Sequence, residues 1–219
     1  MKLHLGCGTV IRDDWVNVDY ALGARLRNVP VLGALVGRLG IFNTDWHPDI
    51  VLHDLRKPLP WGDGTAEAIY TSHTLEHLDK DNGERFIREC HRVLRPDGIL
   101  RICVPNLRGY VEEYRAGRLP ARDMMTELNV LGWRDRGVAK ELYALLSNSF
   151  HRCMYDEASL TALLDRCGLA ARTCQPRESD IADIDGFEHP PDAWTPDRLA
   201  RNLFVEARKG RRPAPQIDR

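Results

Sequence analysis

The sequence predicts a single α/β domain whose sheet is mostly parallel and doubly wound. Short apolar segments bounded by turn residues alternate with helical patterns, and the first three of these segments end in glycine or aspartate. With 219 residues, the chain is long enough for one domain with a sizeable core, or for one domain with a lid.

Seven segments have the pattern of strands, and two have a clear helical pattern. The helix expected at 83–94 presents Phe86, Ile87 and Cys90 on one apolar face. The helix expected at 156–169 starts at an Asp156 cap and stops at Gly168. A turn at 95–98 leads into the fifth strand. The expected strands are 2–6, 15–19, 49–55, 66–72, 98–106, 170–175 and 202–210.

Three stretches do not fit a minimal sheet and are interpreted as insertions, at about 21–48, 107–150 and 176–199. They contain Trp46, Trp133 and Trp194, and long connections in α/β proteins usually lie on the binding face or form lids. We therefore expect one domain over 1–210 whose insertions form a lid and the substrate site. The basic tail at 211–219 is expected to be disordered.

Charge and composition narrow the class of protein. The net charge of −1 gives no electrostatic reason to expect a nucleic acid partner. Six cysteines without a C-x-x-C pair favour reduced thiols and a cytoplasmic location. The first strand leaves no room for a signal peptide, and the most apolar segment, 29–42, is too short to span a bilayer.

A glycine turn and two acids follow the first three strands. Gly6 and Gly8 would let the backbone approach a ligand closely, and Asp19 could accept hydrogen bonds from ribose hydroxyls. Asp54 with Leu55 would suit the amino group and ring face of an adenine. A dinucleotide oxidoreductase would have a third glycine where this chain has Ile11.

These segments together resemble class I S-adenosylmethionine-dependent methyltransferases over nearly the whole chain. The motifs that carry the resemblance are "LHLGCG", "NVD", "HDL", "SHTLEHL" and "HRVLRPDGILRICVPN". The resemblance implies a Rossmann-like, seven-stranded sheet with an antiparallel last strand. The short link after the glycine turn suggests a stunted first helix, so the 21–48 insertion is expected to close that side. The implied S-adenosylmethionine-binding residues are Leu5, Gly6, Cys7, Gly8, Asp19, Asp54, Leu55, Ser72 and His73.

The segment "TSHTLEHL" contains an H-x-x-E-H array, His73, Glu76 and His77, whose spacing would place three side chains on one helix face. Inverted zinc peptidases share this pattern, but here it follows a core strand rather than lying on a long helix. Either the array holds loops together by hydrogen bonds, or it binds a divalent metal.

The metal interpretation comes from a second resemblance. Some class I methyltransferases that act on RNA 3′ ends or quinone precursors have E-x-x-E-H and a later histidine, and bind Mg²⁺ or a similar ion. Here His73 replaces the first glutamate, and "SFHRCMYDEASL" places the later histidine at His151. The resemblance implies a magnesium or manganese site at Glu76, His77 and His151, with His73 as a further candidate. His73, His151 and Glu76 are the expected catalytic residues, with His73 or His151 as the base.

The expected function is O-methylation of a sugar or oligosaccharide hydroxyl, because the motifs look most like bacterial sugar and polysaccharide O-methyltransferases. The group that acts on mycobacterial methylmannose polysaccharides is one example. A quinol-like or phenolic acceptor, an RNA 3′ end, a non-catalytic nucleotide-binding module and a metallohydrolase remain alternatives. Arg101 and Asn106 are interpreted as structural or substrate-rim residues. The oligomeric state, including a homodimer, stays open.

Overall fold

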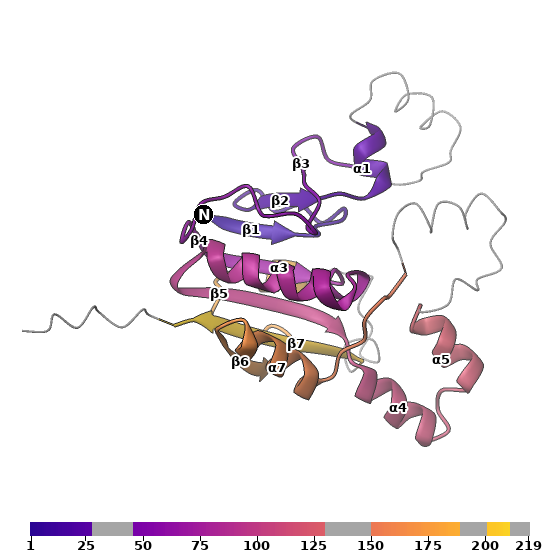
Figure 1. Ribbon diagram of the computed structural model, residues 1–219. Helices are drawn as coiled ribbons and strands as arrows, with labels where there is room; N and C mark the ends of the chain where they lie inside the picture. Colours follow the sequence, from indigo (N-terminus) through magenta and orange to yellow (C-terminus); the bar gives the residue numbers. More distant parts are fainter. Residues whose placement is uncertain (28–45, 130–149, 189–200, 211–219) are drawn as a thin grey trace, which may run out of the picture.

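The protein forms a seven-stranded sheet with helices packed against it (Figure 1). The computed structural model describes residues 1–27, 46–129, 150–188 and 201–210. Trp133, Trp194, the apolar segment 29–42, parts of all three insertions and the tail lie outside these residues. Among the described helices, none has the length and apolar character needed to cross a bilayer.

The strands are arranged in the order β3-β2-β1-β4-β5-β7-β6. β7 is antiparallel to both of its neighbours, and the other described pairings are parallel. The predicted fold class, including the antiparallel last strand, is therefore confirmed. The strand bounds are β1 (Lys2–Leu5), β2 (Val16–Asp19), β3 (Val51–Leu52), β4 (Ala66–Ser72), β5 (Leu94–Pro105), β6 (Leu169–Cys174) and β7 (Asn202–Lys209).

Two strands differ from the expected segments. β3 is much shorter than 49–55, because only Val51 and Leu52 pair with β2. β5 begins at Leu94 rather than at Gly98, and its register against β4 shifts where the expected turn lies. Asp97 in that turn has a left-handed φ of 61°, which bends the chain without ending the strand.

Two amphipathic helices, α3 (Lys80–Val93) and α7 (Glu157–Arg166), cover one face of the sheet (Figure 1). Asp79 caps α3 through the backbone N–H of Asn82. Asp156 caps α7 as predicted, in a capping box with Ser159. The buried faces of both helices pack on alternate residues of β5, namely Leu100, Ile102 and Val104.

The opposite face is covered by residues 175–188, which end in the short helix α8 (Asp185–Glu188). Ile181, Ile184 and Phe187 pack on Tyr70 and Ala68 of β4. Arg101 points to this face from β5, with no exposed surface, and makes two hydrogen bonds of 2.9 and 3.0 Å to Glu188. Of the two interpretations of Arg101, the structure therefore supports the structural one.

The remaining helices lie near the carboxyl edge of the parallel strands (Figure 1). They are α1 (Leu22–Arg27), the 3-10 helix η1 (Leu75–His77), α4 (Leu107–Arg115) and α5 (Ala121–Glu127). The expected stunted helix between β1 and β2 is absent, since residues 6–15 form only turns. Asn17 fixes this link, because its side chain accepts from the N–H of Arg12 and donates to the carbonyls of Arg12 and Trp15.

Candidate active site

The turn after β1 requires glycine at two positions for different reasons. Gly6 has φ +76°, and a Cβ there would lie 2.0 Å from Oγ1 of Thr74. Gly8 has φ +56°, but a Cβ there would meet no atom within 4 Å. Gly6 therefore lets the turn pack against the residue before η1, whereas Gly8 leaves open space above the turn.

Asp19 connects the ends of β1 and β2. Its Oδ2 accepts the backbone N–H of Gly8 at 2.8 Å, and its Oδ1 accepts that of Ala21 at 2.7 Å. The N–H groups of Gly6 and Cys7 also donate to the carbonyl of Val18. The glycine turn is thus held in one position, with a carboxylate at its rim that can accept further hydrogen bonds.

Asp54 lies two residues after β3, where Arg56 binds it with two side-chain hydrogen bonds of 2.7 and 2.8 Å. The hydrogen bond from Arg56 holds the pKa of the Asp54 carboxyl below its usual value, so the pair stays charged at neutral pH. Arg56 is not among the predicted site residues, and the only signal for it in the sequence is a basic residue two positions after the acid.

These strand ends border a cleft of about 390 Å³. Six of the predicted cofactor residues line it: Gly6, Gly8, Asp19, Asp54, Leu55 and His73. Leu5, Cys7 and Ser72 do not line it; Leu5 and Cys7 are buried behind the turn, and Ser72 ends β4. The lining also includes residues outside that prediction: Tyr20, Ala21, Trp46, Arg56, Thr74, His77 and Leu78.

The H-x-x-E-H array does not form one face of an α-helix, contrary to the prediction. Glu76 and His77 lie on the single turn of η1, whereas His73 precedes it with a left-handed φ of 50°. That backbone conformation is costly for a residue with a Cβ, and it turns His73 toward Glu76. Nδ1 of His73 lies 3.0 Å from Oε1 of Glu76, a hydrogen bond in which the ring N–H donates.

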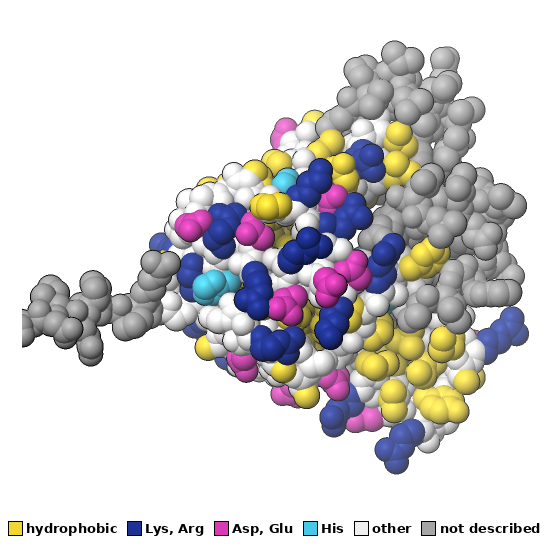
Figure 2. All heavy atoms as spheres, in the orientation of Figure 1, with side chains coloured by type: hydrophobic (Ala, Val, Ile, Leu, Met, Phe, Trp, Pro, Cys, Tyr) yellow, Lys and Arg dark blue, Asp and Glu magenta, His cyan; other side chains and the backbone are white. Residues whose placement is uncertain are grey.

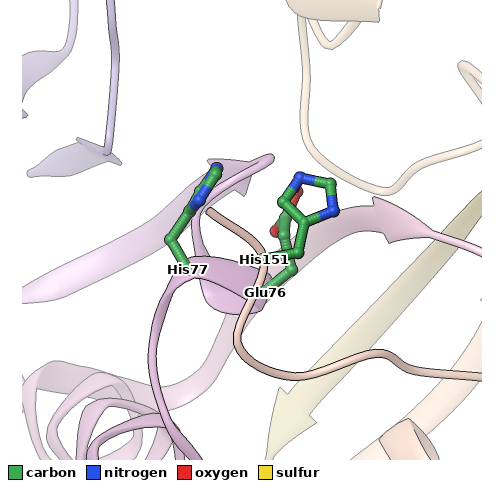
Figure 3. Close-up of side chains that lie close together, drawn as sticks. All are labelled: Glu76, His77 and His151. Atoms are coloured by element: carbon green, nitrogen blue, oxygen red, sulfur yellow. The ribbon is translucent and has the colours of Figure 1, made fainter. Parts of the chain in front are cut away.

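Glu76, His77 and His151 form the candidate metal cluster (Figure 3). Each offers one ligand atom, and these atoms all lie within 4.8 Å of one another. Segment 150–153 is fixed on η1 because the N–H groups of Arg152 and Cys153 donate to the Glu76 carbonyl. Nδ1 of His77 donates to the carbonyl of Phe150 at 3.2 Å, so Nε2 carries the lone pair of the neutral ring. His73 contacts Glu76 but is not part of the cluster.

Two buried polar atoms of this cluster have no hydrogen-bond partner among the described residues, Oε2 of Glu76 and Nδ1 of His151. Burial opposes the charge on Glu76, but the hydrogen bond from His73 outweighs it and keeps the carboxyl pKa below its usual value. Burial lowers the pKa of His151 to about 4, so its ring is neutral at pH 7. Burial disfavours the protonated form of His73, but hydrogen bonds with Cys103 and Glu76 raise its pKa.

The donor set of the cluster is one carboxylate, from Glu76, with two imidazoles, from His77 and His151. Such a set suits a divalent transition metal.

The comparisons with known proteins agree with this fold and cleft. Residues 3–102 match the family model described as a methyltransferase domain, a region that includes the glycine turn, both acids and the H-x-x-E-H array. A search of curated proteins gives no match.

Solved structures share the fold at low sequence identity. An S-adenosylmethionine-dependent methyltransferase from Methanosarcina mazei is 17% identical, with a TM-score of 0.52 over 95% of this chain and 92% of that chain. A chain in the complex between the Haloferax volcanii Trm112 methyltransferase activator and a methyltransferase is 14% identical. Its TM-score is 0.52, over 97% of this chain and 83% of that chain. The family model supports the prediction of a methyltransferase, and the solved structures confirm the predicted fold.

Proposed function

We propose that this methyltransferase transfers a methyl group from S-adenosylmethionine to a hydroxyl of a sugar or oligosaccharide with the help of a divalent cation. The observation that carries the proposal is the position of His77, which lines the cleft and also belongs to the cluster with Glu76 and His151. A cation bound there would lie at the edge of the cofactor cleft. The sugar class itself is supported by the resemblance of the sequence motifs.

The residues around the cleft fit the proposed cofactor. The open space at Gly8 lets a ligand approach the backbone, and the Asp19 carboxylate at the rim can accept hydrogen bonds from ribose hydroxyls. Asp54 and Leu55 would face the adenine, with Arg56 holding the Asp54 carboxylate in place. Leu5 and Cys7 would support the turn from its buried side rather than touch the ligand.

Trp46 supports the proposal that the 21–48 insertion closes the cofactor side. Its ring lines the cleft, and it packs so closely on Gly23 of α1 that a Cβ there would lie 2.3 Å from the indole Nε1. Within the proposed single domain over 1–210, the other two insertions would complete the lid and the substrate site.

In the proposed reaction, bound S-adenosylmethionine supplies an activated methyl group on a sulfonium. The acceptor oxygen would gain the methyl group as the carbon–sulfur bond breaks, leaving a thioether, and the hydroxyl proton would pass to solvent when the cluster holds a cation. Glu76, His77 and His151 would hold that cation, which would supply Lewis-acid activation that makes the acceptor hydroxyl more acidic. The cluster contains two imidazoles, which favours Mn²⁺ over Mg²⁺ by ligand type.

His73 and His151 would then have different roles. His73 would orient the Glu76 carboxylate through their 3.0 Å hydrogen bond. Without a cation, the ring of His151, which is neutral at pH 7, would be the proton acceptor in the transfer, acting as a weak base. Activity that survives a chelator in metal-free protein would support this second route.

The test begins with calorimetry of the purified protein with S-adenosylmethionine and S-adenosylhomocysteine, where binding of both is expected. A labelled methyl donor is then offered with saccharides, quinols and small RNAs, with and without Mn²⁺ or Mg²⁺. Metal-dependent labelling of a saccharide is expected. Labelling only of a quinol or an RNA would overturn the sugar assignment, and zinc-dependent hydrolysis without cofactor binding would overturn the whole proposal. A His151→Ala variant with near-normal turnover would remove that residue from the site.

A further inference from the structure

We propose that the exposed surface of α4 and α5 docks on an anionic phospholipid bilayer. This surface, the α4–α5 face, consists of the apolar side chains Val111, Tyr114 and Met125 and the arginines Arg108, Arg115, Arg118 and Arg122. It is separate from the cofactor cleft, and its proposed role does not depend on which acceptor is methylated.

The apolar side chains of the face are exposed, although those of α4 recur at the helical spacing that is typical of a buried face. None of the residues of α4 or α5 is buried. Val111, Tyr114 and Met125 are 38%, 50% and 40% exposed, and they are three of the seven exposed large apolar side chains in the described residues. Figure 2 shows the resulting apolar area over α4 and α5, at the lower right. In α4, Leu107, Val111 and Tyr114 follow the spacing of one helix face.

Arginines border this apolar area in both helices. At 100° per residue, Arg115 lies beside Val111 on α4, and Arg122 lies beside Met125 on α5. Arg108 and Arg118 add two more exposed cations along the same segment.

The acidic residues of the segment mostly lie away from the apolar side chains. The two helices and their connection carry four arginines and four acids, Glu112, Glu113, Asp123 and Glu127. At 100° per residue, Glu113 lies on the side of α4 opposite Val111, and Asp123 and Glu127 lie on the side of α5 opposite Met125. Glu113 and Glu127 both form ion pairs with Arg201, which precedes β7. The face therefore combines apolar side chains with a cationic rim. This combination complements a bilayer, whose acyl chains are apolar and whose headgroups are anionic.

The same charges argue against a second copy of the chain as the occupant. A symmetric pairing through this face would bring the arginine rims of two copies together, while three of the four acids lie on the opposite sides of the helices. A bilayer interface instead suits tyrosine rings and long arginine side chains, whose stems lie along apolar surface while their charged ends reach the phosphates.

The α4–α5 face is attached to the active-site edge of the sheet. The chain leaving α5 passes Asn129, whose carbonyl accepts the backbone N–H of His151 at 3.2 Å. Docking would therefore hold the Glu76, His77 and His151 cluster close to the membrane surface. An acceptor carried on a lipid would be within reach of such an enzyme.

The test is co-sedimentation of the full chain with vesicles of phosphatidylcholine alone and of equal parts phosphatidylcholine and phosphatidylglycerol. Binding is expected to the anionic vesicles and to weaken with added salt. The variant V111S/Y114S/M125S should bind at least about tenfold more weakly, and R118E/R122E should bind anionic vesicles no better than neutral ones.

The controls are V51S, an exposed valine on edge strand β3, and R85E, an exposed arginine on α3; both should bind like the parent. Circular dichroism would confirm that each variant is folded. Equal binding of the parent and V111S/Y114S/M125S, or no binding to either vesicle, would overturn the proposal. A dimer in sedimentation velocity that the same triple variant dissociates would assign the face to a second copy instead.

Discussion

Nε2 of His151 lies 3.9 Å from Oε1 of Glu76, which has no exposed surface. The two residues come from segments far apart in the sequence, one just after β4 and the other just before α7. Burial removes water from the Glu76 carboxylate, but the hydrogen bond from His73 to Oε1 outweighs that cost. The other oxygen, Oε2, has no partner among the described residues. A cation bound to the folded cluster would stabilise it further.

A Glu76→Gln variant separates a metal ligand from a structural hydrogen-bonding group. We expect the metal-free variant to be less stable than the parent, because the ion-paired hydrogen bond from His73 lowers the Glu76 pKa and an amide oxygen is a weaker acceptor. Affinity for Mn²⁺ should fall by at least about 100-fold. The increase in melting temperature that Mn²⁺ causes in the parent should therefore be lost in the variant. Calorimetry and thermal unfolding with and without the ion measure the two effects.

Glu84→Gln is the matched control, because Glu84 is a partly exposed acid on α3 that pairs with Arg88. It should leave Mn²⁺ binding unchanged. If Glu76→Gln destabilises the metal-free protein but the parent binds no Mn²⁺, the array is only a structural element and the metal hypothesis is wrong.

Substitution by alanine is expected to act mainly on stability at Gly6 and mainly on cofactor binding at Gly8. Gly6→Ala should lower the free energy of unfolding by more than about 2 kcal/mol, because a left-handed φ and a clash with Thr74 add together. Gly8→Ala should cost only about 1 kcal/mol, since its Cβ would meet no protein atom. Its methyl group would instead point into open space at the cleft and weaken S-adenosylmethionine binding by about tenfold or more.

Urea unfolding measures the stability of each variant, and calorimetric titration with S-adenosylmethionine measures its affinity for the cofactor. Similar stability and affinity for the two variants would mean that the turn does not contact the cofactor in the way we propose.

The sequence predicted the sheet and the cleft better than it predicted the geometry of the array. Period-two apolar segments, a glycine turn and strand-end acids are local signals, and parallel strands bring their carboxyl ends to one edge. Gly6, Asp19 and Asp54 could therefore be placed together without a structure. The spacing of His73, Glu76 and His77 wrongly predicted one shared helix face. Only one helical turn forms there, and His73 adopts a left-handed φ before it.

Contacts between segments that lie far apart in the sequence were the other feature that could not be predicted. Nothing in the periodicity of residues 175–188 shows that they cover the second face of the sheet, where Glu188 reaches Arg101. Arg56 was missed for a related reason: a charged residue after a strand has no pattern that distinguishes an ion pair in a cleft from a solvated side chain.

The buried pair of Arg101 and Glu188 predicts a large and non-additive loss of stability. Arg101→Met should reduce the free energy of unfolding by about 3–5 kcal/mol, because it leaves the Glu188 carboxylate buried without its cation. Adding Glu188→Met should restore part of that loss. Recovery should be incomplete, since Arg101 also donates to the carbonyls of Gln175 and Glu178. Urea unfolding of both single variants and the double variant gives the coupling energy, and additive losses would contradict a buried pair.

His4 predicts that the protein loses stability in mild acid. The ring lies in β1 with 3% of its surface exposed, packed edge-on against Phe187 at 4.8 Å between ring centroids. Burial lowers its pKa to about 4, from a usual value of 6.5. Between these two values the unfolded chain binds a proton at His4 that the folded protein does not bind. Stability is therefore fully present above pH 6.5 and falls as the pH decreases toward 4.

At pH 5 this single group should cost about 2 kcal/mol relative to pH 7, rising to about 3 kcal/mol below pH 4. His4→Leu keeps an apolar side chain against Phe187 but cannot bind a proton, so it should remove that part of the pH dependence. The measurement is the free energy of unfolding in urea at pH 7 and pH 5 for both proteins. His151 also has a lowered pKa and contributes acid sensitivity of its own, which both proteins share and which cancels in the comparison. Identical pH dependence in the two proteins would show that the His4 ring is already protonated, or hydrated, in the folded state.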